Sequence, residues 1–362
     1  EMVGNEWVEL GVTELGSNQY ADAYQWEEEV FNGETGNVTV YHSINADSMF
    51  AITVVNTEDN AYYKPPKGVK GEYDPINQLE SKEQSLVLQF NGLPSEHKGA
   101  AKKTLLNLSG DRAKSYLTYD RMKMYIYGDS PWIGSDETDV EMFIQFGFGD
   151  NYYELIQPVY NGWDESENRN SVNLDLNWLT ALKVKDSTNI EKIRETDIFV
   201  DSSTVKHYYF TDQNGELTGK KISIYGSPAI QRSQYFTVGV RNRADEPITG
   251  EIWLDELRLS GVKKEKGIAM RVQSKINLSD IGSATIMYSR KDADFHVLQQ
   301  RLGTNTTTED FRLNTSINLS KFLPKSLGIN IPLTTSYSNS VSKPKYIPGS
   351  DIYINPASVP DS

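Results

Sequence analysis

The sequence contains no cysteine, only four histidines and no long apolar run. The absence of cysteine excludes thiol catalysis, thiolate metal sites and a disulfide framework. No segment reaches the roughly 18 consecutive apolar residues that a membrane-spanning helix needs. The histidines are scattered and form no HExxH or HxH pattern, so we expect no metal site at His42, His97, His207 or His296.

Positive charge is also scarce. Lys and Arg total 36 against 50 Asp and Glu, which gives a formal net charge of −14. Proteins that bind nucleic acid contact its phosphates with clustered cations, so a nucleic-acid partner is not expected. Acidic clusters at 136–141 and 164–167 lack the ordered spacing of a calcium loop, and we interpret them as solvated loops.

Signatures of catalysis are missing as well. The sequence has no P-loop and no Gly-x-Ser-x-Gly elbow. Gly147-Phe148-Gly149 lacks the rest of a dinucleotide fingerprint, and we interpret it as a turn. We therefore predict a protein that is not an enzyme, with no catalytic, cofactor-binding or metal-binding residues.

Short runs rich in Tyr, Thr, Val and Ile, separated by Gly, Pro, Asn and Asp, dominate the first 262 residues. This pattern favours an antiparallel, jelly-roll-like β-sandwich over a parallel sheet with crossover helices. One short helix is expected at 174–182, where Leu176, Leu179 and Leu182 could share a face. Residues 62–66 (YYKPP) should be extended. The predicted strands are 38–41, 50–55, 85–90, 122–127, 140–146, 152–156, 221–225, 235–240 and 251–259.

The segment GEIWLDELRLSGV at 250–262 predicts the closing strand of this domain, with one irregularity in its alternation. Asp255 and Glu256 could instead act as a carboxylate pair or bind calcium. Adjacent residues of a strand point to opposite faces, so the two side chains would not converge on one ligand. We favour the structural interpretation.

The pattern changes at Ile268, after a charged linker at 263–267, and alternation becomes strict. In 311–320 the odd positions carry Phe, Leu, Thr, Ile and Leu, and the even positions are polar. The runs at 270–278, 284–288 and 327–338 repeat the arrangement, so residues 268–340 predict about four strands with one apolar face. A Pro-containing loop at 341–362 follows.

Two architectures produce such alternation: a soluble sheet with one buried face, and a transmembrane β-barrel. The strong runs cover about 9 to 11 residues, the length of a tilted membrane-spanning strand. Short turns at 279–282 and 321–326 and a long segment at 291–309 favour the barrel. Four strands cannot close a barrel, so most of its wall would lie outside this chain. The first residues do not form a signal peptide, as expected of an internal fragment.

Several motifs resemble, in the same order, those of the SprA (Sov) family. They are NTEDN at 56–60, PPKGV at 65–69, EQSL at 83–86, NYYE at 151–154, GKKISIYGSP at 219–228, TVGVRN at 237–242 and GEIWLDELRL at 250–259. Family members usually carry a second aromatic or apolar residue and Asn where this chain has Leu254-Asp255, a mild departure. The resemblance implies a fragment of the outer-membrane, protein-conducting translocon of the Bacteroidetes type IX secretion system, which also supports gliding motility. It further implies secreted cargo proteins, other secretion components and outer-membrane lipid as partners.

The loop lengths also predict an orientation. Outer-membrane barrels keep periplasmic turns short, so the β-sandwich, an insertion or cap domain, would lie on the extracellular side. The alternative function is a carbohydrate-binding jelly-roll module of a cell-surface protein, in which Trp132, Trp163 or the pair Tyr152-Tyr153 would stack on sugar rings. We favour the interpretation that these rings fill the sandwich core or its rim.

Overall fold

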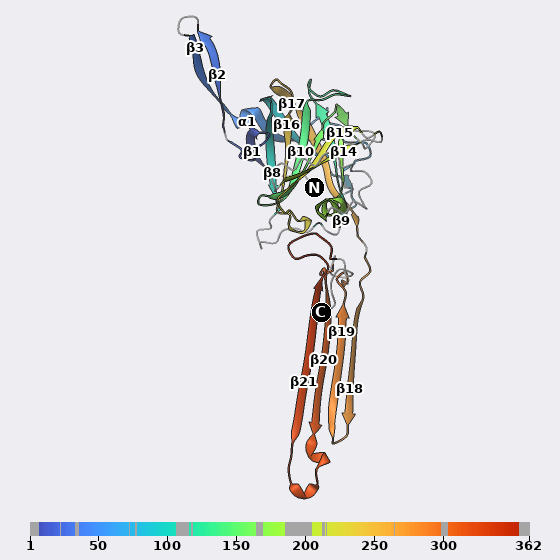
Figure 1. Ribbon diagram of the computed structural model, residues 1–362. Coiled ribbons are helices and arrows are strands. Elements are labelled where there is room, and N and C mark those ends of the chain that lie inside the picture. Colours follow the sequence, from blue (N-terminus) through green and yellow to red (C-terminus); the bar gives the residue numbers. More distant parts are fainter. Residues whose placement is uncertain are drawn as a thin grey trace. The chain divides into compact units, whose positions relative to one another are not determined.

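The computed structural model describes residues 7–21, 23–32, 36–71, 73–76, 78–105, 116, 119–163, 169–184, 205–211, 214, 216–263, 265–297 and 303–354. The chain divides into two compact units, Glu1–Val262 and Lys263–Ser362. Both are built almost entirely from antiparallel strands, which confirms the all-β prediction. Figure 1 shows the strands of each unit.

Two sheets form the main body of the first unit. The larger has seven strands in the order β1 (Trp7–Glu14), β8 (His97–Thr104), β16 (Tyr235–Asn242), β10 (Val140–Phe148), β11 (Asn151–Pro158), β15 (Leu217–Tyr225) and β14 (Val205–Thr211). The second has the order β12 (Gly162–Trp163), β9 (Tyr119–Asp129), β17 (Ile248–Val262), β7 (Gln84–Leu93) and β4 (Phe50–Asn56), with β13 (Ser171–Asp175) also paired to β9. All nine strands predicted in this region are present.

Smaller elements complete this unit. They are the hairpin of β2 (Ala23–Asn32) and β3 (Gly36–Asn45), the helix α1 (Ala46–Met49), the two-residue strands β5 (Tyr73–Asp74) and β6 (Leu79–Glu80), the helix α2 (Leu176–Val184) and the 3-10 turn η2 (Ile230–Arg232). Helix α2 confirms the predicted helix two residues further along the chain. Leu176, Leu179 and Leu182 are all buried, as their spacing required.

The sandwich core lies between the two sheets. Buried residues of β10 and β16, such as Ile144 and Val238, are complemented by Leu88 of β7 and Ile252 of β17. The sheets pack closely enough that a Cβ at Gly99 of β8 would come within 2.3 Å of the Phe50 ring on β4. Interiors packed at this density tolerate little change in side-chain volume.

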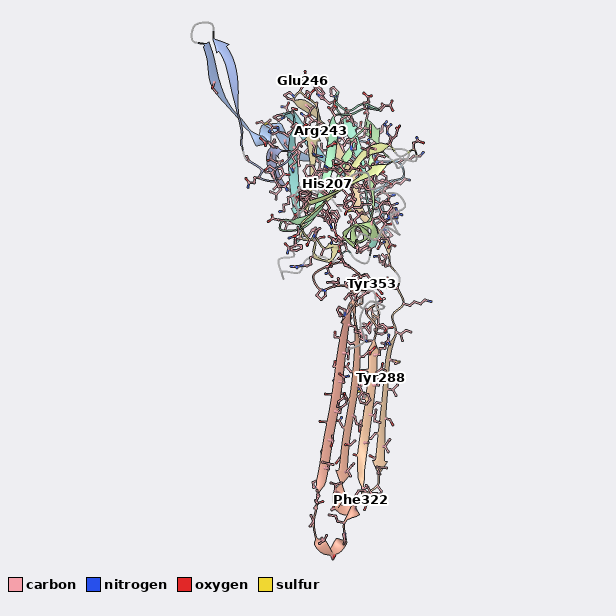
Figure 2. All side chains as sticks on the ribbon, in the orientation of Figure 1. His207, Arg243, Glu246, Tyr288, Phe322 and Tyr353 are labelled. Atoms are coloured by element: carbon pink, nitrogen blue, oxygen red, sulfur yellow. The ribbon has the colours of Figure 1, made fainter. Side chains whose placement is uncertain are left out.

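The second unit is a four-stranded sheet in sequence order: β18 (Ala269–Leu278), β19 (Gly282–Lys291), β20 (Thr306–Asn318) and β21 (Pro332–Pro344). The sheet is open, because β18 and β21 are edge strands within the described residues. None of the described side chains on these four strands is buried. Figure 2 shows their side chains projecting from a single layer.

One predicted boundary in this sheet is wrong. The run at 327–338 was expected to be a strand from its start, but residues 319–331 form a connection with two 3-10 turns, η3 (Leu319–Phe322) and η4 (Lys325–Leu327). Gly328 has a φ of 59°, in the left-handed region, which interrupts an extended chain in spite of the alternating Leu327, Ile329 and Ile331. The turn predicted at 321–326 is therefore longer than expected.

A partly buried lysine, Lys345, connects the start of the second unit to its sheet. The Lys345 side chain is 9% exposed, and its Nζ lies 2.7 Å from Asp294 Oδ1 and also contacts the Glu265 carboxylate. The Lys345 amide donates to the carbonyl of Asn305 at 2.9 Å. Glu265 belongs to the charged linker predicted at 263–267, so this lysine holds part of the linker in place.

We expect Lys345→Met to loosen this linker, because two carboxylates then face each other without a cation. Trypsin cleavage at Lys263 or Lys266 of the detergent-solubilised protein should become several-fold faster, since proteolysis follows local opening. Lys343→Met, at an exposed position two residues earlier, is the matched control and should leave the rate unchanged. Equal rates in both variants would show that the ion pairs do not restrain the linker.

Candidate functional site

The four-stranded sheet gathers its apolar side chains on one face. Directly paired residues of antiparallel strands project to the same face, and the observed register aligns the apolar positions of all four strands. The rows on this face are Val272, Tyr288, Phe311 and Asn339; Ser274, Ile286, Leu313 and Tyr337; Ile276, Ala284, Thr315 and Thr335; and Leu278, Gly282, Ile317 and Leu333. We call this the apolar face. The alternation of the separate strands thus combines into one continuous surface.

The opposite face is hydrophilic, and we call it the polar face. Its rows are Arg271, Ser289, Asp310 and Ser340; Gln273, Met287, Arg312 and Ser338; Lys275, Thr285, Asn314 and Ser336; and Asn277, Ser283, Ser316 and Thr334. Most of these side chains are small and carry hydroxyl or amide groups. A shallow groove along β20 and β21 is lined by Arg312, Asn314, Ser336 and Ser338, among others.

The apolar face ends in a charged and aromatic border. Beyond the Val272 row lie Met270, Arg290, Glu309 and Val341. The Arg290 guanidinium is 3.5 Å from Glu309 Oε1 and 3.0 Å from Asp292 Oδ1, so its charge is compensated. The Phe311 ring lies 6.1 Å from Tyr337 between centroids, and Phe311 pairs with Tyr288 of β19. Aromatic rings bordering an apolar band are typical of strands at a membrane interface.

The described part of the first unit contains two buried carboxyl groups, Glu154 on β11 and Asp255 on the predicted closing strand. Asp255 is 1% exposed, and Tyr63 Oη donates to its Oδ2 at 3.2 Å. Ser85 Oγ lies 2.8 Å from the same tyrosine hydroxyl. Burial, and then the nearby Glu83, raise the pKa of Asp255 from 3.8 to about 7. Such a carboxyl is largely protonated below neutral pH.

The irregularity predicted in this strand is a bulge. The register of β17 against β9 shifts between Asp255 and Arg258, and Glu256 has a φ of 50°. The Glu256 carboxylate accepts from Arg258 Nη1 at 2.7 Å, while Asp255 faces Tyr63. The two adjacent carboxyl groups therefore have separate partners.

A cluster of aromatic rings covers Asp255 and the outer face of β17. Trp253 stacks on Tyr127 at 4.2 Å between centroids and contacts Tyr63 at 5.6 Å. Trp163 lies 5.2 Å from Tyr127, and its Nε1 donates to the carbonyl of Lys64 at 2.7 Å. The segment that contains Tyr63 and Lys64 is thus held against the outer face of β17, with Tyr62 in a turn.

The residues considered for sugar binding are not an open platform. Tyr152 and Tyr153 are buried, and Trp163 belongs to the aromatic cluster over β17. Trp132 is half-buried in the loop after β9. In the described part of the chain, these four rings do not form an exposed surface together.

The other candidate residues stay apart. His42 lies on β3, His97 on β8, His207 on β14 and His296 in the connection after β19. Within the described ranges, no group of three or more His, Asp or Glu side chains could hold a metal ion. Residues 136–141 run from an exposed loop into β10, and the cluster at 164–167 lies outside the described residues.

No helix in the described parts of the chain has both the length and the apolar character required to cross a membrane.

Two packed antiparallel sheets and a separate two-faced sheet define an all-β protein. The family model described as motility related/secretion protein matches residues 21–357. The chain therefore belongs to the SprA family, which is a motility and secretion family and not a family of enzymes. No curated protein matches the chain significantly.

The buried carboxyl of Asp255 predicts a pH dependence of stability. The folded-state pKa of Asp255 is raised, so the native state binds this proton more tightly than the unfolded chain. The free energy of unfolding should fall as pH rises from about 4 to about 7, by up to roughly 4 kcal/mol in total. Asp255→Asn should remove this slope and be the more stable protein at pH 8.

Tryptophan fluorescence during urea unfolding measures this effect, because all six tryptophans lie in the first unit. Asp129→Asn, an exposed carboxyl on β9, is the control and should retain the slope. A wild-type stability that does not change across this pH range would contradict the assignment.

Proposed function

We propose that the four-stranded sheet is part of the wall of an outer-membrane β-barrel, and that the chain is a fragment of the protein-conducting translocon of the type IX secretion system. The observation that carries this proposal is the alignment of the apolar positions of all four strands on one face of a sheet against which no second layer packs among the described residues. A soluble sheet would bury this face against another element. In the proposed barrel, lipid acyl chains contact the apolar face instead.

The exposure of the apolar face supports a lipid environment. Val272 is 61% exposed, Leu278 51% and Leu333 44%. Contiguous apolar patches of this kind are rare on monomeric soluble proteins, because each square ångström exposed to water costs about 25 cal/mol. Strands of 10 to 13 residues are long enough to cross the hydrocarbon layer when tilted.

The open edges of the sheet fit the same proposal. β18 and β21 each present an edge without a partner in the described chain, and unpaired backbone groups are not tolerated in lipid. Closure therefore needs further strands, which we place in the longer translocon. Its other proposed contacts are secreted cargo and further components of the secretion system.

The sandwich is then an extracytoplasmic domain attached to the first barrel strand. We propose that it caps the extracellular end and shapes the exit for cargo. The loop lengths that suggested this orientation are less distinct than the sequence indicated, since the connection at 319–331 is nearly as long as that at 292–305. A direct labelling test therefore decides the orientation.

The carbohydrate-binding alternative has less support. It requires exposed rings on one surface, whereas Tyr152, Tyr153 and Trp163 are engaged in packed contacts.

The apolar face predicts an asymmetric response to charge. Leu313→Arg or Ile317→Arg in the full-length protein should impair assembly by about 2 to 4 kcal/mol per site near the bilayer midplane. Asn314→Arg, on the adjacent polar position, is the matched control and should be mild. Protease resistance and recovery in the outer-membrane fraction measure assembly, and equal tolerance of the two faces would favour a soluble sheet.

The proposed orientation predicts which connection faces outward. Thr304 and Ser326 are exposed and lie at opposite ends of the sheet, so each can be replaced singly by cysteine. The chain has no cysteine of its own that would react with the labelling reagent. In intact cells, an impermeant thiol reagent should label Thr304→Cys and spare Ser326→Cys. The reverse labelling would place the sandwich in the periplasm.

A further inference from the structure

Cationic side chains on the two faces of the four-stranded sheet differ in whether a carboxylate pairs with them. On the apolar face the Arg290 guanidinium has two carboxylate neighbours, Glu309 and Asp292. On the polar face Arg271, Lys275 and Arg312 are exposed, and none has a carboxylate within ion-pair distance among the described residues. The Arg271 guanidinium donates only to Gln273 Oε1 at 3.4 Å and to Met287 Sδ at 3.2 Å.

A single carboxylate, Asp310, shares the rows of the polar face with these three cations. It accepts a hydrogen bond from Ser340 Oγ at 2.7 Å. The face is thus locally cationic on a chain whose net charge is −14. Unpaired cations with the same orientation on one surface create a field that attracts anionic partners.

We propose that the polar face is a docking surface for acidic stretches of polypeptide. Arg271 and Lys275 lie on β18 and Arg312 lies on β20, and all three project to the polar face. Of the three, Arg312 lines the groove along β20 and β21, together with Asp310 and with Asn314, Ser336 and Ser338, whose short side chains can hydrogen-bond to a passing backbone. The surface therefore combines weak electrostatic attraction with little apolar area to retain a chain.

An anionic lipid headgroup is the less suitable occupant. A lipid needs an apolar surface for its acyl chains beside the cationic site, and Met287 is the one large apolar side chain in the rows of the polar face, while the others lie on the opposite face. Arg290, the cation that lies next to them, is already paired. The location of this surface inside a channel rests on the proposed function, whereas the binding itself does not.

The test uses full-length protein in detergent and a short fluorescent oligoglutamate peptide, with oligolysine of equal length for comparison. Replacing Arg271, Lys275 and Arg312 together by Gln should weaken oligoglutamate binding about tenfold, since each exposed ion pair contributes only modestly. Replacing the three by Glu should abolish it and favour oligolysine. Fluorescence anisotropy at low and high salt measures both.

The matched control changes three exposed lysines of the sandwich, Lys64, Lys67 and Lys70, to Gln, which removes the same net charge elsewhere. This variant should bind oligoglutamate like the wild type. Binding that is unchanged in the polar-face variant, or reduced equally in the control, would overturn the proposal. Binding to phosphatidylglycerol vesicles is measured in parallel. If the polar-face variant lost vesicle binding but kept oligoglutamate binding, the surface would be a lipid site and the proposal would be wrong.

The two proposals fail separately. If Leu313→Arg has no effect on membrane assembly but oligoglutamate binding still needs the three cations, the docking surface is supported and the barrel proposal is refuted. If the strands insert as expected and the peptide binds equally to all variants, only the docking surface is refuted.

Discussion

The in-register pairing of strands β18 to β21 is the constraint on which the two-faced sheet depends. Side chains alternate with a period of two, so a slip of one residue in any pair would move that strand's apolar set to the polar face. The observed register places Val272, Tyr288 and Phe311 in one row and Gln273, Met287 and Arg312 in the next. The apolar face, the polar face and the charge distribution all follow from this alignment.

Local patterns were sufficient to predict most of the strands, because each carried its own alternation and its own turn residues. The prediction missed β1, β2, β8, β13 and β14, as well as the two-residue strands β5, β6 and β12. In β8, for example, the sequence HKGAAKKT has little β propensity, and the strand is placed by pairing with β1 and β16 on either side. The error at 327–331 has the opposite cause. There alternation persisted, but Gly328 adopts a left-handed conformation that periodicity does not reveal.

The contacts of the first unit depend on residues far apart in the sequence. Asp255 and Tyr63 are separated by 192 positions, so sequence spacing could indicate the strand and its irregularity but not the hydroxyl that reaches the carboxyl. The bulge at Glu256 allows Asp255 to face Tyr63 while its neighbour pairs with Arg258. The same limitation applies to Lys345, whose carboxylate partners come from the linker and from a distant connection.

The charges give an independent argument about the surroundings of the two faces. An unpaired charge is costly where water is excluded, whereas an exposed cation in water needs no partner. Arg290 borders the apolar face and is paired with carboxylates, while Lys275 and Arg312 occupy the polar face without any in the described chain. We expect this difference between Arg290 and the two polar-face cations if one face meets lipid and the other an aqueous channel through which polypeptide passes.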